Sequence, residues 1–138
     1  MSTSKIGFVA SAFDLLHPGH ILMLKEAKSA CDYLVACLHV DPSQERSFKN
    51  RPVQNIVERQ IQLKGTRYVD EIIVYETEEQ LLEIIKSIHF DIRIIGEDYL
   101  GKDFTGKEFC LENNIEIYYA KRRHSYSSSG LLERIRNV

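Results

Sequence analysis

Short apolar runs alternate with amphipathic segments along the whole of this 138-residue chain. Apolar runs occupy about residues 5–10, 33–40, 71–75, 92–95 and 115–119, and helical patterns occupy about 19–29, 53–65, 77–88, 107–112 and 128–136. Strands that alternate with helices build a parallel sheet, and a strand that is apolar throughout, like 33–40, is buried on both faces. The pattern predicts a single α/β domain over residues 1–138, Rossmann-like and three-layered, with a central parallel sheet of five strands.

Composition argues against several classes of protein. A net charge of −2 argues against a nucleic-acid or membrane-surface binder, and no apolar run approaches the ~20 residues that a membrane span needs. The opening residues 1–5 lack the apolar core of a signal peptide. The three cysteines form no C-x-x-C pair, and Cys31 and Cys37 stand in apolar contexts, as reduced core thiols do. We therefore expect a cytoplasmic protein.

One motif stands where the first predicted strand gives way to a helix. His17 and His20 flank Pro18 and Gly19 there. Proline fits the first helical position because its φ is fixed, and glycine lets a ligand approach the backbone closely. The N–H groups and positive dipole end of a helix start attract phosphate, and two imidazoles can donate further hydrogen bonds to it. The alternative is a pair of ordinary surface histidines in a turn.

Other polar clusters follow the ends of other predicted strands. Lys49 lies in a polar loop, residues 43–52, that follows the second strand and that we expect to be mobile. Gly96 follows the fourth strand, and Arg122 and three serines at 127–129 follow the fifth. Ligands of open α/β sheets bind at the carboxyl ends of the strands. The sequence therefore predicts one site that gathers these clusters on a single rim.

These pieces resemble one enzyme family. Residues 13–20 (FDLLHPGH) match the H-x-G-H signature of the nucleotidyltransferase superfamily. Residues 68–73, residues 94–99, Arg122 and residues 127–129 parallel further motifs of its small cytidylyltransferase branch, which is typified by glycerol-3-phosphate cytidylyltransferase. The resemblance covers nearly the whole chain, and it implies a homodimer.

The resemblance implies an enzyme that transfers CMP from CTP to a small phosphomonoester and releases pyrophosphate by in-line attack on the α-phosphate. Glycerol 3-phosphate or a related polyol, sugar or aminoalcohol phosphate would be the acceptor, and Mg²⁺ would arrive with the nucleoside triphosphate. Such a transfer needs positioning and positive electrostatics rather than a protein nucleophile. One alternative is an ATP-dependent adenylyltransferase that acts on a sugar phosphate or cofactor precursor. A remote alternative is a non-catalytic, nucleotide-binding regulatory module.

The resemblance also assigns site residues. The predicted catalytic residues are His17, His20, Lys49 and Arg122, of which the histidines would stabilise the α-phosphate and the cations would neutralise phosphate charge. The residues predicted to bind the nucleotide are Ser11, Ala12, Phe13, Asp14, Gly19, Arg59, Gly96, Asp98, Ser127, Ser128 and Ser129. Simpler alternatives are an N-cap for the serines and for Asp14, a turn for Gly96, and a solvated helix position for Arg59.

The chain departs from the family's pattern in three places. Ala12 stands where the family often has a small hydroxyl residue, and Ser11 precedes it. Residues 124–125 are His-Ser where the family usually has Glu-Gly, and residues 101–107 form an insert. The second departure lies close to where the acceptor and the phosphates would meet, and the insert can remodel the pocket. The identity of the acceptor is therefore open at this point.

Overall fold

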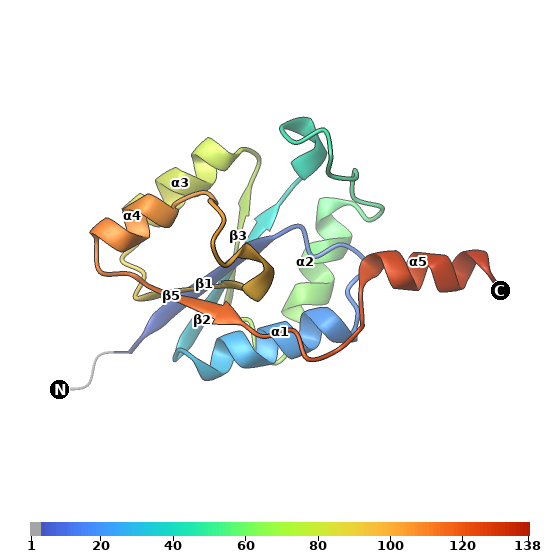
Figure 1. Cartoon of the computed structure of the whole chain (residues 1–138), viewed down its shortest axis with the longest axis horizontal. Coiled ribbons are helices and arrows are strands. Elements are labelled where there is room, and N and C mark those ends of the chain that lie inside the picture. Colours follow the sequence, from blue (N-terminus) through green and yellow to red (C-terminus); the bar gives the residue numbers. More distant parts are fainter. Residues whose placement is uncertain (1–3) are drawn as a thin grey trace.

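Strands and helices alternate from end to end in the computed structural model, which describes residues 4–138 (Figure 1). The strands are β1 (Ile6–Ser11), β2 (Tyr33–His39), β3 (Glu71–Tyr75), β4 (Ile92–Gly96) and β5 (Glu116–Ala120). The helices are α1 (Pro18–Ser29), α2 (Ile56–Lys64), α3 (Glu78–Ser87), α4 (Lys107–Glu112) and α5 (Ser128–Arg136), with 3₁₀ turns at Pro42–Gln44 and Glu97–Tyr99.

The structure bears on the expectation that the chain has no membrane span, and only in part on the expectation that it has no signal peptide. None of the helices within residues 4–138 combines the length and the apolar character that a membrane crossing requires. The expectation about a signal peptide rests partly on residues 1–3, which lie outside the described residues.

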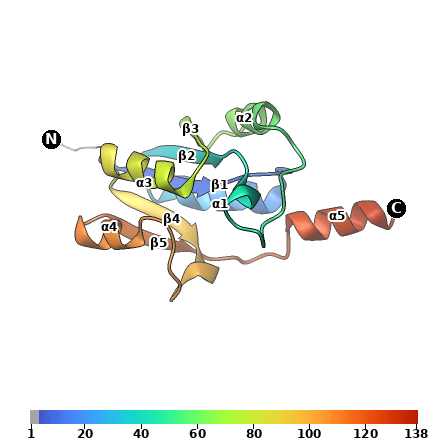
Figure 2. The same ribbon diagram turned by 90° about the horizontal axis from the view of Figure 1, so that it is seen from above.

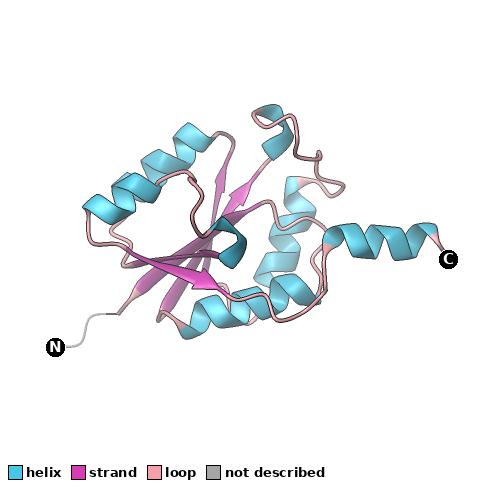
Figure 3. Cartoon of the chain, in the orientation of Figure 1, coloured by secondary structure: helices cyan, strands magenta, loops and turns pink. Residues whose placement is uncertain are grey.

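The five strands form one parallel sheet in the order β3-β2-β1-β4-β5 (Figure 3). This confirms the predicted α/β fold with a central parallel sheet. The direction in which successive strands are added reverses between β1 and β4, and at such a switch point the loops leaving the strands diverge and open a crevice. The β1–α1 loop and Gly96 at the end of β4 border this crevice, so the topology places the H-x-G-H motif at it.

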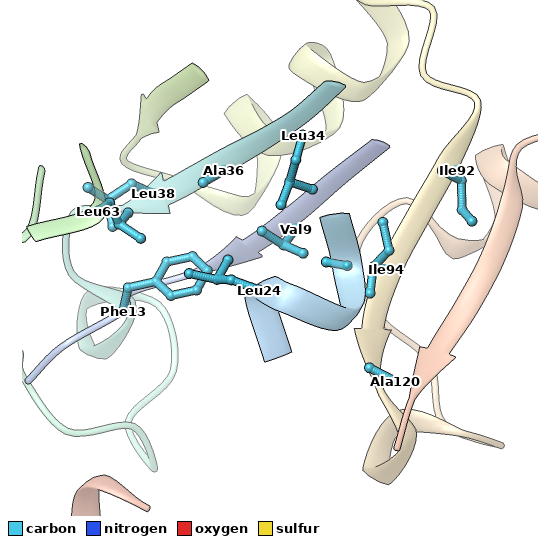
Figure 4. Close-up of a cluster of buried hydrophobic side chains, with 11 residues drawn as sticks. Val9, Phe13, Leu24, Leu34, Ala36, Leu38, Leu63, Ile92, Ile94 and Ala120 are labelled. Atoms are coloured by element: carbon cyan, nitrogen blue, oxygen red, sulfur yellow. The ribbon is translucent and has the colours of Figure 1, made fainter. Parts of the chain in front are cut away.

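Two apolar layers hold the helices against the sheet. On one face, Leu24 of α1 and Leu63 of α2 pack with Val9 of β1 (Figure 4). On the other face, Ile85 of α3 packs with Phe8 of β1 in a cluster that also includes α4. Each of these fully buried side chains contributes about 1.5–3 kcal/mol to folding. All of β2 after its first residue is buried, as predicted for a strand covered on both faces.

The predicted bounds of one helix need correction. The helix predicted over 53–65 is α2, which begins at residue 56, whereas each of the other elements lies within one residue of its predicted bounds. The Asn55 side chain accepts a hydrogen bond from the Glu58 N–H at 2.8 Å, and the Glu58 carboxylate accepts one from the Asn55 N–H at 2.9 Å. This reciprocal capping box fixes where the helix begins.

A buried arginine occupies the inner face of α2. Arg59 is 2% exposed, and its guanidinium donates to four backbone carbonyls. Nε donates to Gln54 at 3.1 Å, Nη1 to Ala12 at 3.0 Å and to His39 at 2.6 Å, and Nη2 to Val40 at 2.6 Å. Burial lowers the pKa of Arg59, yet an arginine stays charged. One cation therefore ties the loops that leave β1 and β2 to the start of α2.

Replacement of Arg59 by methionine tests this role. Arg59→Met keeps an unbranched apolar stem but leaves the four carbonyls without their donor, so we expect the free energy of unfolding to fall by about 3 kcal/mol or more. Urea unfolding measures this loss, with exposed Arg67→Met as the matched control. A loss below about 1 kcal/mol in Arg59→Met would contradict the structural role.

Candidate active site

The rim of the sheet carries two pockets that meet at the carboxyl end of β1. The α1 pocket, of about 610 Å³, lies between α1 and the ends of β4 and β5. The α3 pocket, of about 370 Å³, lies between the loop after β2, the start of α3 and segment 101–107. Four residues line both pockets, namely Ser11, Phe13, His20 and Ser128.

The predicted site residues divide between these pockets. Those that line the α1 pocket are Ser11, Phe13, His17, Gly19, His20, Gly96, Asp98, Arg122, Ser127 and Ser128. Four others, Ala12, Asp14, Lys49 and Ser129, line the α3 pocket instead. Arg59 lines neither pocket, because its donors are engaged by carbonyls beneath the rim. The clusters after β1, β4 and β5 therefore come together, whereas the basic loop after β2 faces the second pocket.

The two motif histidines cap the start of α1 with their ring nitrogens. His17 is the N-cap residue, and its Nδ1 accepts a hydrogen bond from the Gly19 N–H at 3.0 Å. The Nδ1 of His20 accepts one from the His17 N–H at 3.2 Å, which completes a reciprocal capping box. The two ring centroids lie 4.0 Å apart. Each ring is thus held by a backbone donor that a helix start would otherwise leave unpaired.

These hydrogen bonds fix the chemical form of both imidazoles. An Nδ1 that accepts a hydrogen bond carries no proton, so the proton of the neutral ring is on Nε2. Burial and the neighbouring His17 lower the pKa of His20 to about 4, against an opposing effect of Asp14. Burial, His124 and Arg122 lower the pKa of His17. Near pH 7 both rings are therefore uncharged, and each has an Nε2–H to donate.

His124 is a third imidazole in the α1 pocket, and it was not among the predicted site residues. Its Nδ1 accepts a hydrogen bond from the Tyr126 N–H at 3.1 Å. A Cβ on Gly19 would lie 3.0 Å from Cε1 of His124 and 2.7 Å from Cε1 of His17, so both rings pack against this glycine. The signal in the sequence that could have identified His124 was its position, because the family usually has glutamate there.

A second helix start adjoins the first. Ser127 caps α5 by accepting a hydrogen bond from the Gly130 N–H at 3.0 Å. The Ser128 hydroxyl donates to the Asp14 carbonyl at 3.4 Å, which joins the first turn of α5 to the β1–α1 loop. The rest of α5 projects away from the domain (Figures 1 and 2). Two positive helix ends therefore converge on the α1 pocket, and such ends attract anions.

Asp14 shapes the rim through backbone contacts. Its carboxylate accepts hydrogen bonds from the Val53 N–H at 2.8 Å and the Gln54 N–H at 2.9 Å. Its neighbours Phe13 and Leu15 have φ values of 48° and 51°, a left-handed conformation that costs a non-glycine residue about 1 kcal/mol or more. Both oxygens of Asp14 thus hold this strained loop through backbone N–H groups, and its role at the nucleotide stays a prediction.

Side chains also join the ends of β4 and β5. The Glu97 carboxylate accepts a hydrogen bond from the Arg122 N–H at 3.1 Å, and Arg122 Nη2 donates to the Tyr126 carbonyl at 2.7 Å. The Asp98 carboxylate folds back over the end of β4, where a Cβ on Gly96 would lie 2.5 Å from its Oδ1. Arg122 therefore orders the closing loop and also contributes to the pocket lining.

The donor set of the α1 pocket suits a polyphosphate. Neutral imidazole N–H groups, helix starts, hydroxyls and Arg122 all stabilise negative charge. Across residues 4–138, no cluster of three or more histidine, cysteine or carboxylate side chains is placed to hold a metal ion.

Comparisons with known proteins identify the family to which the chain is similar. The sequence model of the family described as Cytidylyltransferase-like matches residues 8–134. Curated relatives named "Bifunctional protein HldE" include one from Caulobacter vibrioides, 33% identical over 95% of this chain and 27% of that protein. Another, from Helicobacter pylori, is 35% identical over 97% of this chain and 28% of that protein. The chain therefore spans little more than a quarter of the length of these relatives.

Solved structures share the fold. A lipopolysaccharide core biosynthesis protein from Thermoplasma volcanium superposes with a TM-score of 0.68 at 24% identity, over 91% of this chain and 100% of that one. A pantoate-beta-alanine ligase from Francisella tularensis, complexed with beta-gamma ATP and beta-alanine, gives a TM-score of 0.59 at 20% identity, over 98% of this chain and 66% of that one. At these identities the likeness concerns the fold alone.

The lowered pKa of His20 makes stability depend on pH. As the pH falls through 6.5, His20 takes up a proton in the unfolded chain, whereas in the folded chain it stays neutral down to about 4. The unfolded state therefore binds more protons in this range, and the free energy of unfolding declines as the pH falls. Between about pH 7 and about pH 5, urea unfolding should show wild type losing roughly 1–2 kcal/mol more than His20→Gln. Equal losses in the two proteins would contradict the assignment.

The capping geometry also predicts tautomers. In nitrogen-15 spectra near pH 7, His17 and His20 should each carry the proton on Nε2 and none on Nδ1, because a backbone N–H occupies each Nδ1. Exposed His89 serves as the control, and its ring should not show this fixed preference for one tautomer. A protonated Nδ1 in His17 or His20 at this pH would disprove the proposed caps.

Proposed function

The chain belongs to the cytidylyltransferase-like family of nucleotidyltransferases, and from this premise we propose that it transfers a nucleoside monophosphate from a nucleoside triphosphate to a small phosphomonoester. The observation that carries the proposal is the pair of neutral imidazoles, His17 and His20, at a helix start that adjoins a second helix start. A phosphate oxygen of the acceptor attacks the α-phosphorus, the bond to the bridging oxygen of the β-phosphate breaks, and pyrophosphate leaves.

The residues of the α1 pocket have distinct tasks in this transfer. The Nε2–H groups of His17 and His20 donate to the oxygens of the α-phosphate, where negative charge grows in the transition state. Arg122 and the hydroxyls of Ser127 and Ser128 hold the departing pyrophosphate at the start of α5. Because both imidazoles are neutral and already oriented, they stabilise this charge without reorganising.

Two pockets that meet at one edge suit a reaction between two substrates. In our proposal the nucleotide occupies the α1 pocket and the acceptor occupies the α3 pocket, with Lys49 neutralising the acceptor phosphate. The residues shared by the two pockets, which include His20 and Ser128, then lie where the attacking oxygen meets the α-phosphorus. The acceptor oxygen then attacks from the α3 pocket while pyrophosphate leaves within the α1 pocket, so the attacking and leaving oxygens can lie in line.

Two nucleoside triphosphates are candidates for the donor substrate. CTP is the first candidate, because the matched family is cytidylyltransferase-like. ATP, with a sugar phosphate as acceptor, is the second, because adenylyltransferases of the same superfamily use the same H-x-G-H chemistry. Mg²⁺ would be carried by the triphosphate, whose charge it would partly neutralise, since Mg²⁺ prefers phosphate oxygens and water to a protein cage. We also propose that the protein forms a homodimer and acts in the cytoplasm.

A pyrophosphate-release screen tests the activity. The protein is incubated with Mg²⁺ and each of CTP, ATP, UTP and GTP, paired with polyol, sugar and aminoalcohol phosphates. We expect release that needs both the triphosphate and an acceptor. If triphosphates bind but no pair yields pyrophosphate, the catalytic proposal fails and a regulatory nucleotide-binding module is favoured.

Substitution of the motif histidines tests the mechanism. His17→Ala and His20→Ala should each lower kcat by about 10²-fold or more, the scale of losing one preorganised transition-state donor. Exposed His89→Ala, which lies after α3 and away from the rim, should keep wild-type turnover. Circular dichroism checks that the variants are folded. Near-normal turnover in both motif variants would remove the histidines from the mechanism.

A further inference from the structure

The α3 pocket contains a buried cation that the transfer chemistry does not use. Arg93 of β4 lines this pocket and is 4% exposed. Its guanidinium lies 4.6 Å from the ring centroid of Phe104 and 5.2 Å from that of Phe8. Nη1 donates to the carbonyl of Thr105, which belongs to the insert at 101–107. Arg93 therefore packs between two aromatic rings at the wall where the insert meets β4.

Arg93 differs from the other buried arginine in how its donors are satisfied. Arg59 makes four hydrogen bonds to backbone carbonyls. Within residues 4–138, the guanidinium of Arg93 makes a single hydrogen bond, its buried Nε has no partner, and no carboxylate lies within ion-pair distance of it. A buried cation with unused donors is costly, so its donors favour an oxygen that enters the pocket.

The same wall offers a hydrogen-bond acceptor. Glu78 lines the α3 pocket, with Oε1 at 2.8 Å from Nη2 of Arg46 and Oε2 accepting from the Thr105 hydroxyl at 2.9 Å. Thr105 therefore contacts Glu78 through its hydroxyl and Arg93 through its carbonyl. A donor and an acceptor held together in this way match a hydroxyl group, which both accepts and donates.

The position of Arg93 indicates how far an acceptor must extend from the rim into the α3 pocket to contact it. Arg93 pairs with Phe8 in the sheet, and Phe8 lies three residues before Ser11 at the rim. At about 3.3 Å per residue, the Cα of Arg93 therefore lies about 10 Å below the rim. A three-carbon phosphate whose phosphate group is held at the rim by Lys49 would leave the wall formed by Arg93 and Thr105 without a ligand.

We propose that Arg93 binds a hydroxyl oxygen of the acceptor, and that the acceptor is a polyhydroxylated phosphomonoester, a sugar phosphate, rather than a three-carbon polyol phosphate or an aminoalcohol phosphate. This inference rests on the proposed nucleotidyl transfer. Because the Glu78 carboxylate at this wall is already paired with Arg46, an ammonium group would meet the unpaired positive charge of Arg93, and low dielectric strengthens that repulsion. Phe104 and Tyr99 supply apolar faces against which a sugar ring can pack.

The first experiment measures acceptor preference in the wild type. With the triphosphate that supports turnover, kcat/KM is compared for glycerol 3-phosphate, phosphoethanolamine and a set of pentose and hexose phosphates. At least one sugar phosphate should exceed the other two acceptors by about tenfold or more, the scale of one hydrogen bond to a charged group. A preference for phosphoethanolamine or glycerol 3-phosphate would overturn the proposal.

The second experiment assigns that preference to Arg93. Arg93→Met keeps an unbranched stem between the rings and removes every donor, so kcat/KM for the sugar phosphate should fall about 10- to 100-fold, through KM. The KM for the triphosphate and kcat/KM for glycerol 3-phosphate should change less than about twofold. Exposed Arg67→Met is the matched control and should behave as wild type. An equal loss with all acceptors, or no loss, would contradict a role in acceptor recognition.

A third measurement uses the unaltered protein and needs no turnover. The Nε–H resonance of Arg93, assigned separately from that of Arg59, should shift when the sugar phosphate is titrated in and stay in place with phosphoethanolamine. If sugar phosphate is bound or turned over while this resonance does not move, Arg93 is not its ligand. Absence of pyrophosphate with every substrate pair would instead count against the proposed function itself.

Discussion

The reciprocal hydrogen bonds between the start of α1 and the rings of His17 and His20 are the interaction on which the rest of the site depends. They use the Nδ1 atoms, so they leave Nε2–H as the donor of each ring and set the direction in which it points. Burial lowers the pKa of both rings, helped by His17 in the case of His20 and by His124 and Arg122 in the case of His17, and so keeps them neutral. Gly19 lets the rings of His17 and His124 pack against the helix start. The result is a set of donors that are oriented before any phosphate arrives, at a helix end that already attracts anions.

The frame that holds these donors is built from buried charge as well as apolar packing. Arg59 gathers carbonyls from the ends of β1 and β2, and Asp14 fastens the β1–α1 loop to the segment before α2. These two residues therefore position the site from beneath and beside it. Arg93 is buried to a similar degree, but among residues 4–138 its guanidinium has a single hydrogen-bond partner. Arg59 therefore completes the fold, whereas Arg93 has donors left for a ligand.

Much of this could be predicted from sequence, for physical reasons. Apolar runs alternating with amphipathic segments specify a parallel α/β sheet, and its topology alone brings the ends of β1, β4 and β5 together. The start of α2 lies three residues later than predicted because the Asn55–Glu58 capping box sets it, a signal that apolar spacing does not contain. The burial of Arg59 could not be predicted, because it depends on carbonyls from three separate segments. The contact of His124 with Gly19 and the division into two pockets likewise depend on how the loops fold back.

The most direct test of this account is a crystal structure of the protein with Mg²⁺ and a triphosphate analogue that cannot be cleaved between the α- and β-phosphates. The account predicts that Nε2 of His17 and Nε2 of His20 both lie within hydrogen-bond distance of α-phosphate oxygens, with the β- and γ-phosphates at the start of α5. A triphosphate bound elsewhere, or one whose α-phosphate contacts neither imidazole, would contradict it.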